Sequence, residues 1–224
     1  MNIQTQLLRA AGDIIYPESD GQPMAENTLQ FESITTIKGG LDAVFLDQSD
    51  VFVAGDLFWY PVEGRPDIRT APDVMVVFGR PKKHRGSYLQ WLEEGIPPKV
   101  TFEVQSPGNR PGEMVRKFQF YERYGVDEYY IYDPDHELLD GWKRAGPELK
   151  EIANLDGWIS PALGIRFEFT GGKLKIYGPD GRPFATYVEL VQQRDRARLE
   201  GEKQHQRAER LAAQLRTLGV DPDV

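Results

Sequence analysis

Two acidic side chains stand where the surrounding residues indicate buried strands. Asp73 follows Pro72 at the start of the apolar run VMVVF, and Glu103 lies inside VTFEV thirty residues later. A buried carboxylate is costly unless it is paired, hydrogen-bonded or metal-bound, and two carboxylates held close together repel each other. If the two runs are neighbouring strands, both acids reach one end of a sheet, where they require a cation between them.

Two further polar side chains are predicted near this acid pair. Gln105 shares a strand face with Glu103, because strand side chains alternate between faces. Lys117 borders the apolar face of the next predicted helix and is expected to point toward Glu103. An amine or amide beside two carboxylates and a divalent ion can orient a water molecule or offset the charge that develops on a phosphate.

Each of these residues also has a simpler interpretation. Glu103 could form a buried ion pair with Lys117 or Arg116 and have no other role. The sole role of Gln105 could be a hydrogen bond to a carboxylate, and Lys117 could extend along its helix to solvent. The residue types alone leave these alternatives open.

Composition limits the kind of metal and the kind of protein. The 224-residue chain has a net charge of −8, no cysteine and three histidines far apart in the sequence. The absence of cysteine excludes thiolate sites, and the scattered histidines argue against a histidine-rich site. Oxygen ligands are then expected, and they favour Mg²⁺ or Mn²⁺. No segment has the length and apolarity of a membrane span, so we expect a cytoplasmic protein without membrane association.

The elements that would position these residues alternate along the chain. Apolar periodicity predicts helices over 26–48, 87–95 and 111–126, strands over 50–62, 71–79, 97–107 and 127–135, and hairpins between 138 and 187. The strand, helix, strand order around 97–135 indicates a parallel crossover. The predicted fold class is α/β, with a mixed β-sheet flanked by helices, extra β-hairpins and a long C-terminal helix.

The chain divides into three predicted segments. Residues 1–24 form an N-terminal arm that is loosely attached, 25–187 form the folded domain, and 188–224 form a C-terminal helix with equal numbers of acidic and basic residues. The narrow apolar stripe of this helix favours a coiled-coil homodimer over a basic arm for DNA or a lone solvated helix. It consists of Ala208, Leu211, Leu215 and Leu218.

One basic run breaks the acidic character of the chain. The sequence GRPKKHRG, residues 79–86, places four basic side chains within six positions. It is either a solvated loop or a loop that contacts phosphates.

The ordered motifs resemble a known family. Pro72 and Asp73, followed by Glu103-Val104-Gln105, resemble the PD-(D/E)XK nuclease motif with glutamine in the lysine position. The set APDVMVVFG, FEVQSPGNR and RKFQFYERYGVDEYYIYDPD resembles the Uma2 family of restriction-endonuclease-like proteins, and the closing RAERLAAQLRTLGVDPD resembles the tail of its cyanobacterial members. The resemblance covers most of residues 25–190.

The resemblance implies an activity and a cofactor. It implies an endonuclease that depends on Mg²⁺ or Mn²⁺, hydrolyses phosphodiester bonds and has DNA as its partner. Asp73, Glu103 and the carbonyl of Val104 would hold the metal ion.

It also implies where the site departs from the pattern. Gln105 cannot carry the usual positive charge, so Lys117 would supply the amine from the helix. Glu32 on the first helix is the available additional acid, and Asp56 would lie just outside the metal ligands. The alternative is a catalytically weak or inactive nuclease-fold protein that acts as a DNA-binding or assembly module.

Overall fold

The computed structural model describes residues 14–19, 21, 23–108 and 111–217. The chain separates into two compact units, Met1–Phe184 and Ala185–Val224. No helix in the described part of the chain is both long and apolar enough to span a membrane. Leu218, the last member of the predicted apolar stripe, lies outside the described residues.

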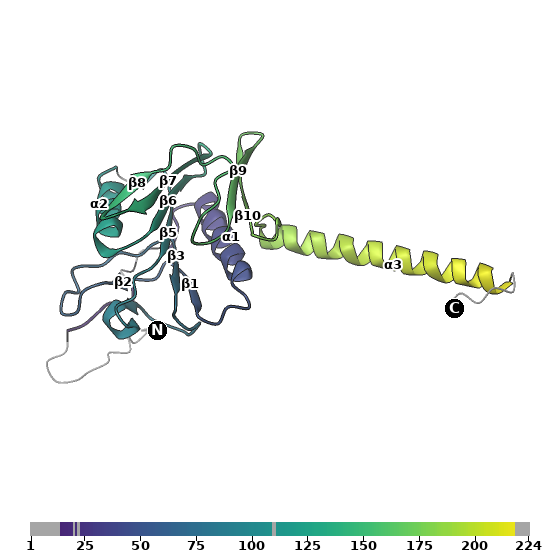
Figure 1. The fold of residues 1–224 in the computed structure, drawn as a ribbon, viewed down its shortest axis with the longest axis horizontal. Helices are drawn as coiled ribbons and strands as arrows, with labels where there is room; N and C mark the ends of the chain where they lie inside the picture. Colours follow the sequence, from purple (N-terminus) through teal and green to yellow (C-terminus); the bar gives the residue numbers. More distant parts are fainter. Residues whose placement is uncertain (1–13, 20, 22, 109–110, 218–224) are drawn as a thin grey trace. The chain divides into compact units, whose positions relative to one another are not determined.

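The first unit is built around a six-stranded mixed sheet (Figure 1). Its strands are, in spatial order, β1 (Val51–Gly55), β3 (Val74–Phe78), β5 (Val100–Val104), β6 (Glu128–Asp133), β7 (Leu138–Ala145) and β8 (Glu148–Glu151). Only β5 and β6 are parallel within it, and helix α2 (Pro111–Tyr124) connects them. The predicted fold class is therefore confirmed, including the parallel crossover.

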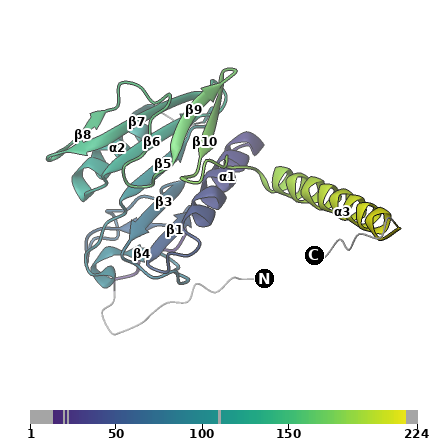
Figure 2. The ribbon, with the colours of Figure 1, turned by 45° about the vertical axis from the view of Figure 1, so that its right-hand side comes forward.

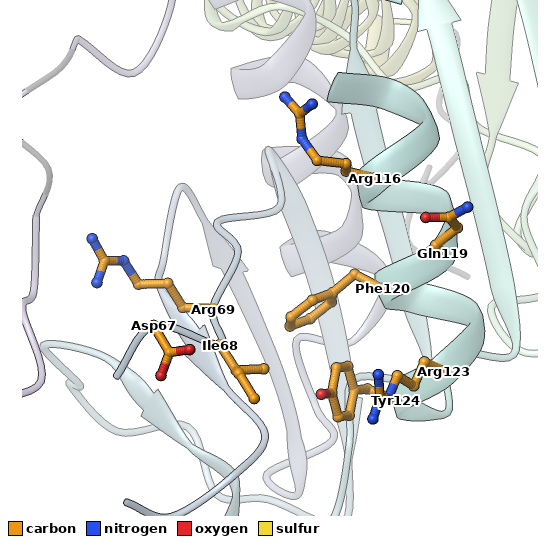
Figure 3. A pocket seen from close by; sticks show the side chains of 8 residues that line it. All are labelled: Asp67, Ile68, Arg69, Arg116, Gln119, Phe120, Arg123 and Tyr124. Carbon is orange, nitrogen blue, oxygen red and sulfur yellow. The ribbon is translucent and has the colours of Figure 1, made fainter. Parts of the chain in front are cut away.

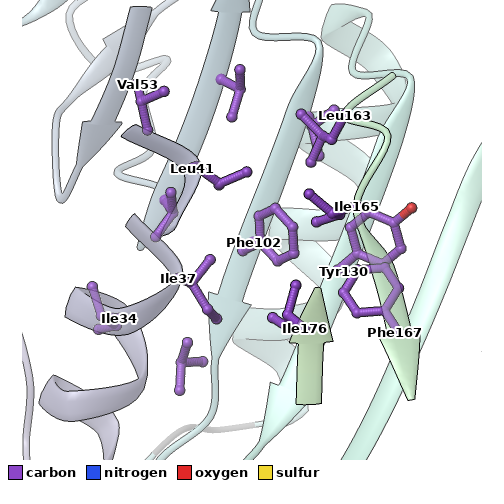
Figure 4. Packing of buried hydrophobic residues seen from close by; sticks show 14 of the residues in the cluster. Ile34, Ile37, Leu41, Val53, Phe102, Tyr130, Leu163, Ile165, Phe167 and Ile176 are labelled. Atoms are coloured by element: carbon purple, nitrogen blue, oxygen red, sulfur yellow. The ribbon is translucent and has the colours of Figure 1, made fainter. Parts of the chain in front are cut away.

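One face of the sheet is covered by helix α1 (Thr28–Val44) and by the hairpin of β9 (Arg166–Thr170) and β10 (Lys173–Tyr177). Figure 4 shows Ile34, Ile37 and Leu41 of α1 on the side of Phe102. Leu29 and Phe31, which the periodicity also places on the buried face, are exposed instead. The buried stripe contains Gln30 in their place, at helical spacing from the three apolar residues.

The opposite face of the sheet is covered by α2 and by aromatic side chains. Trp59 stacks on Tyr121 of α2, with ring centroids 6.3 Å apart, and Tyr121 contacts Tyr129 of β6 edge-on at 4.9 Å. The helix ends at Tyr124, and Gly125 follows with φ of 95°, a conformation that glycine adopts without steric cost. Figure 2 shows α1 and α2 in a second view.

Two predicted elements differ in the structure. The strand expected over 50–62 is divided into β1 and β2 (Trp59–Tyr60), because Asp56 turns the backbone with φ of 46°. The helix expected over 87–95 is β4 (Tyr88–Leu89), which pairs with β2, followed by a 3₁₀ turn, η1 (Gln90–Glu93). At 87–95, pairing with a segment distant in sequence outweighs local helix preference.

The terminal segments are also described in part. Residues 1–13 of the predicted arm lie outside the described residues. Farther along the arm, Tyr16 packs on Tyr60 and Trp91, with ring centroids 5.2 and 5.0 Å apart, and Tyr60 Oη donates to the carbonyl of Pro17. This part of the arm is anchored rather than loose. In the second unit, α3 (Tyr187–Thr217) has no buried residue.

Candidate active site

The register of two antiparallel strands brings the two acids together. Val74 of β3 pairs with Phe102 of β5, so Asp73, one residue before β3, lies opposite Glu103. Phe102 and Val104 pack on the α1 side of the sheet, which directs Glu103 to the α2 side. Asp73 Oδ2 accepts a hydrogen bond of 2.6 Å from the backbone N–H of Val104. The predicted meeting of the acids at one end of the sheet is confirmed.

Helix α2 supplies two side chains to Glu103, which is only 2% exposed. Lys117 Nζ lies 2.7 Å from Glu103 Oε2, and Tyr121 Oη donates to Oε1. The two residues are four positions apart and therefore share one side of the helix. Lys117 reaches the acid pair as the sequence predicted, and its side chain is 19% exposed, so it does not extend freely to solvent.

The acids and the amine perturb one another. Burial and the neighbouring Glu103 carboxylate raise the pKa of Asp73 well above its ordinary value, although Lys117 and the Val104 N–H act in the opposite direction. Burial alone would lower the pKa of Lys117, but Glu103 and Asp73 raise it above its ordinary value. The acids therefore stabilise the charged form of Lys117, and Asp73 is harder to ionise than a free carboxyl even with Lys117 beside it. Such a site favours a further positive charge.

The donor atoms suit a divalent cation with few protein ligands. Among the described residues, no group of three His, Cys, Asp or Glu side chains could hold a metal ion. The available donors are the carboxylates of Asp73 and Glu103 and the carbonyl of Val104. Mg²⁺ commonly binds through one or two carboxylates and keeps several water molecules, so these oxygen atoms fit it.

The residue of α1 that reaches this site is Gln30, not Glu32. Gln30 Nε2 donates to the carbonyl of Val104 at 2.8 Å. This hydrogen bond uses one lone pair of the carbonyl oxygen and leaves the other for a metal ion. Glu32 lies about 200° farther around the helix and is exposed, so its prediction as an additional site acid is wrong. A polar residue in register with Ile34, Ile37 and Leu41 was the signal in the sequence for Gln30.

The other two predicted site residues lie at the edge of the acid pair. Gln105 follows β5, and its backbone N–H donates to the carbonyl of Tyr132 at 2.7 Å. Its half-buried side chain forms no hydrogen bond within the described part of the chain. The N–H of Asp56 donates to the carbonyl of Asp73 at 3.3 Å, and its negative charge contributes to the raised pKa of Asp73.

The basic run 79–86 is largely neutralised by acids of η1 and the residue after it. Arg85 Nε lies 2.7 Å from Glu93 Oε1, Lys83 lies 3.7 Å from the same oxygen, and Arg80 lies 2.7 Å from Glu94 Oε1. Glu93 is buried, and its pKa is lowered mainly by the hydrogen bond from Arg85. These contacts favour a structural loop over a loop that contacts phosphates.

Comparison with known proteins assigns the chain to a family. The family model Uma2, described as "Putative restriction endonuclease", matches residues 22–176. The chain belongs to the Uma2 family. A search of curated proteins finds no match.

A solved structure is similar to this Uma2 protein. It is a crystal structure of a "putative nuclease belonging to DUF820" from Anabaena variabilis ATCC 29413. The two chains are 15% identical with a TM-score of 0.44, over 60% of this chain and 72% of that one.

Two buried tyrosines of the Uma2 site are expected to contribute to stability in opposite ways. Tyr121 donates to the buried Glu103, whereas Tyr129 Oη is buried without a hydrogen-bond partner among the described residues. Tyr121→Phe should lower the free energy of unfolding by about 1.5–3 kcal/mol, and Tyr129→Phe should leave it unchanged or raise it by up to about 1 kcal/mol. Urea unfolding of both variants measures the difference. An equal loss in the two would contradict the assigned hydrogen bond.

Proposed function

We propose that this protein is a metal-dependent endonuclease that hydrolyses phosphodiester bonds in DNA. One observation supports this most: Lys117 Nζ lies 2.7 Å from the buried Glu103, on the strand end opposite Asp73. A purely structural ion pair does not need a second carboxylate whose pKa is raised by burial and by the first carboxylate. Perturbed groups of this kind are typical of functional sites.

Each residue has a specific role in the proposal. Asp73, Glu103 and the Val104 carbonyl would hold Mg²⁺ or Mn²⁺, which when bound polarises a phosphate and lowers the pKa of its water. Lys117 is charged throughout the physiological range, so it acts as an electrostatic group and not as a general base. It orients Glu103 and offsets negative charge on the phosphate. Gln105, at the end of β5, can hold a water molecule through its amide.

The proposal is tested by nicking of supercoiled plasmid DNA. Purified protein should nick the plasmid with Mg²⁺ or Mn²⁺ and should not nick it in EDTA. Asp73→Asn, purified identically, controls for contaminating nucleases. Equal nicking by that variant would refute the assignment.

A second function is favoured by a different observation. Both oxygens of Glu103 already accept hydrogen bonds, and an amide stands in the usual lysine position at Gln105. A nuclease scaffold of this kind could act as a DNA-binding or assembly module without turnover. Calorimetry that detects no Mg²⁺ or Mn²⁺ binding at millimolar concentration, together with no nicking, would favour this function.

We also propose that α3 pairs two copies of the chain. Leu211 and Leu215, one helical turn apart, are 51% and 38% exposed. A long helix without buried residues gains little stability alone, and apolar positions at this spacing fit a coiled-coil seam.

Substitution of the seam is expected to change the molecular mass in solution. The double variant Leu211→Lys, Leu215→Lys should have half the mass of the wild type by light scattering, because lysines at facing positions repel across the seam. The matched control is Gln206→Lys, Ala213→Lys, which adds the same charge on the opposite side of α3. A wild-type monomer, or an unchanged mass in the seam variant, would refute the dimer.

A further inference from the structure

An open pocket of about 310 Å³ lies beside α2, outside the acid pair (Figure 3). One side is formed by Arg116, Gln119, Phe120 and Arg123, which follow the i, i+3, i+4, i+7 spacing of a single helix face. Arg69 lies on the other side of the pocket, in the segment between β2 and β3. The volume of the pocket is within the range of small-ligand pockets.

The positive charge of this pocket is not compensated by acids. Within the described residues, Arg69, Arg116 and Arg123 form no ion pair with Asp or Glu. Asp67, which also lines the pocket, accepts hydrogen bonds of 2.9 and 2.6 Å from Arg65 outside it. Three arginines therefore line one pocket of a chain whose net charge is −8. Guanidinium groups bind phosphate with matched hydrogen-bond geometry.

The pocket also presents aromatic rings. Phe120 and Tyr124 are half-buried, with ring centroids 4.6 Å apart, and both contact Trp59 beneath them. The guanidinium of Arg123 lies 5.5 Å from the Tyr124 ring centroid, and that of Arg69 lies 4.9 Å from the ring of Phe58. Rings held rigidly beside arginines form the kind of surface on which nucleobases stack.

We propose that this pocket binds one unstacked nucleotide of single-stranded DNA. The base stacks on Phe120 and Tyr124, and the flanking phosphates contact Arg69, Arg116 and Arg123. This inference rests on the proposed nuclease function and specifies the form of its substrate.

Helix α2 joins the pocket to the acid pair. Lys117 and Tyr121 directly follow Arg116 and Phe120 in sequence, and both contact Glu103. Neighbouring faces of one helix thus hold the nucleotide and support the carboxylate that would bind the metal ion. A strand bound along α2 has its backbone close to the proposed site of hydrolysis.

Binding can be measured without hydrolysis. Fluorescence anisotropy with a labelled oligothymidylate of roughly 12 nucleotides, in EDTA, should show binding by the full chain. The double variant Arg116→Gln, Arg123→Gln should bind about tenfold more weakly at low salt, and its log–log salt slope should be smaller by about 0.7 for each phosphate that is no longer neutralised. Tyr124→Leu should weaken binding about fivefold or more, because the base then has one ring fewer on which to stack.

Arg182→Gln is a control for the loss of a surface positive charge outside the pocket. Arg182 lies in the turn after β10, on the α1 side of the sheet, and its side chain is 87% exposed. The affinity of this variant should equal that of the wild type. Thermal unfolding of every variant distinguishes a defect in binding from a defect in folding.

The outcomes distinguish this inference from the nuclease function. No binding of the oligonucleotide, unchanged affinity in the folded Arg116→Gln, Arg123→Gln variant, or equal competition by a duplex of the same sequence would each overturn the inference. Any of these with intact plasmid nicking leaves the nuclease function in place. Oligonucleotide binding without nicking supports the pocket and refutes the nuclease function.

Discussion

Replacement of Asp73 by asparagine is expected to lower metal-dependent nicking about a thousandfold or more while stabilising the metal-free protein at neutral pH. Loss of a ligand removes several kcal/mol of transition-state stabilisation, and each 1.36 kcal/mol corresponds to about tenfold in rate. Asparagine Oδ1 can still accept the hydrogen bond from the Val104 N–H. The substitution therefore removes the charge with little change in backbone geometry.

The gain in stability depends on pH with a definite sign. Burial and Glu103 raise the pKa of Asp73, so the folded state binds this proton more tightly than the unfolded state. The contribution of the Asp73 carboxyl to the free energy of unfolding is fully present below its ordinary pKa of 3.8. It is lost as the pH rises through the higher pKa that this carboxyl has in the folded state. In EDTA at pH 8, Asp73→Asn should unfold with a free energy about 1–2 kcal/mol higher than the wild type. The difference should shrink toward pH 5.

Asp133→Asn provides a control of opposite sign. Burial would raise the pKa of Asp133, but the hydrogen bond with His136 lowers it overall, so its carboxylate stabilises the fold at neutral pH. This substitution should lower the free energy of unfolding at pH 8, measured by the same urea titration. A less stable Asp73→Asn variant would contradict the electrostatic account of the site. Unchanged nicking by Asp73→Asn would refute its metal role.

Replacement of Lys117 by methionine is expected to destabilise the metal-free protein and to reduce nicking. Glu103 would keep only Tyr121 as its partner, and loss of one member of a buried pair costs about 3 kcal/mol. Nicking should fall about a hundredfold, as expected for loss of one electrostatic donor. Mg²⁺ should restore part of the stability, because a second cation can compensate Glu103.

The double variant Glu103→Gln, Lys117→Met separates charge from packing. It has no uncompensated charge at this position, so it should recover most of the stability that Lys117→Met removes and remain inactive. Urea unfolding in EDTA and plasmid nicking measure the two effects. A Lys117→Met variant as stable as the wild type would show that the ion pair contributes little.

Local patterns predicted the elements that carry the acid pair. Apolar alternation in 71–79 and 97–107 and helical spacing in 111–126 require only neighbouring residues, and all three correspond to elements of the structure. The same reasoning failed at Asp56 and at 87–95, where the pairing of β2 with β4 depends on residues about thirty positions apart. The resemblance, which implies an acid on the first helix, pointed to Glu32, whereas the buried stripe of α1 contains Gln30.

The sequence by itself determined the face of its strand or helix on which each side chain of the candidate site lies, because that face follows from residue spacing. The pairing of β3 with β5, which sets Asp73 opposite Glu103, came from the tertiary structure. Only the tertiary structure decided which positive charges are available to a ligand. The basic run 79–86 is largely neutralised by Glu93 and Glu94. In contrast, Arg69, Arg116 and Arg123 come from two segments, line one pocket and form no ion pair with the acids of the described residues. The reason is that charge compensation depends on distance in space, which residue spacing does not encode.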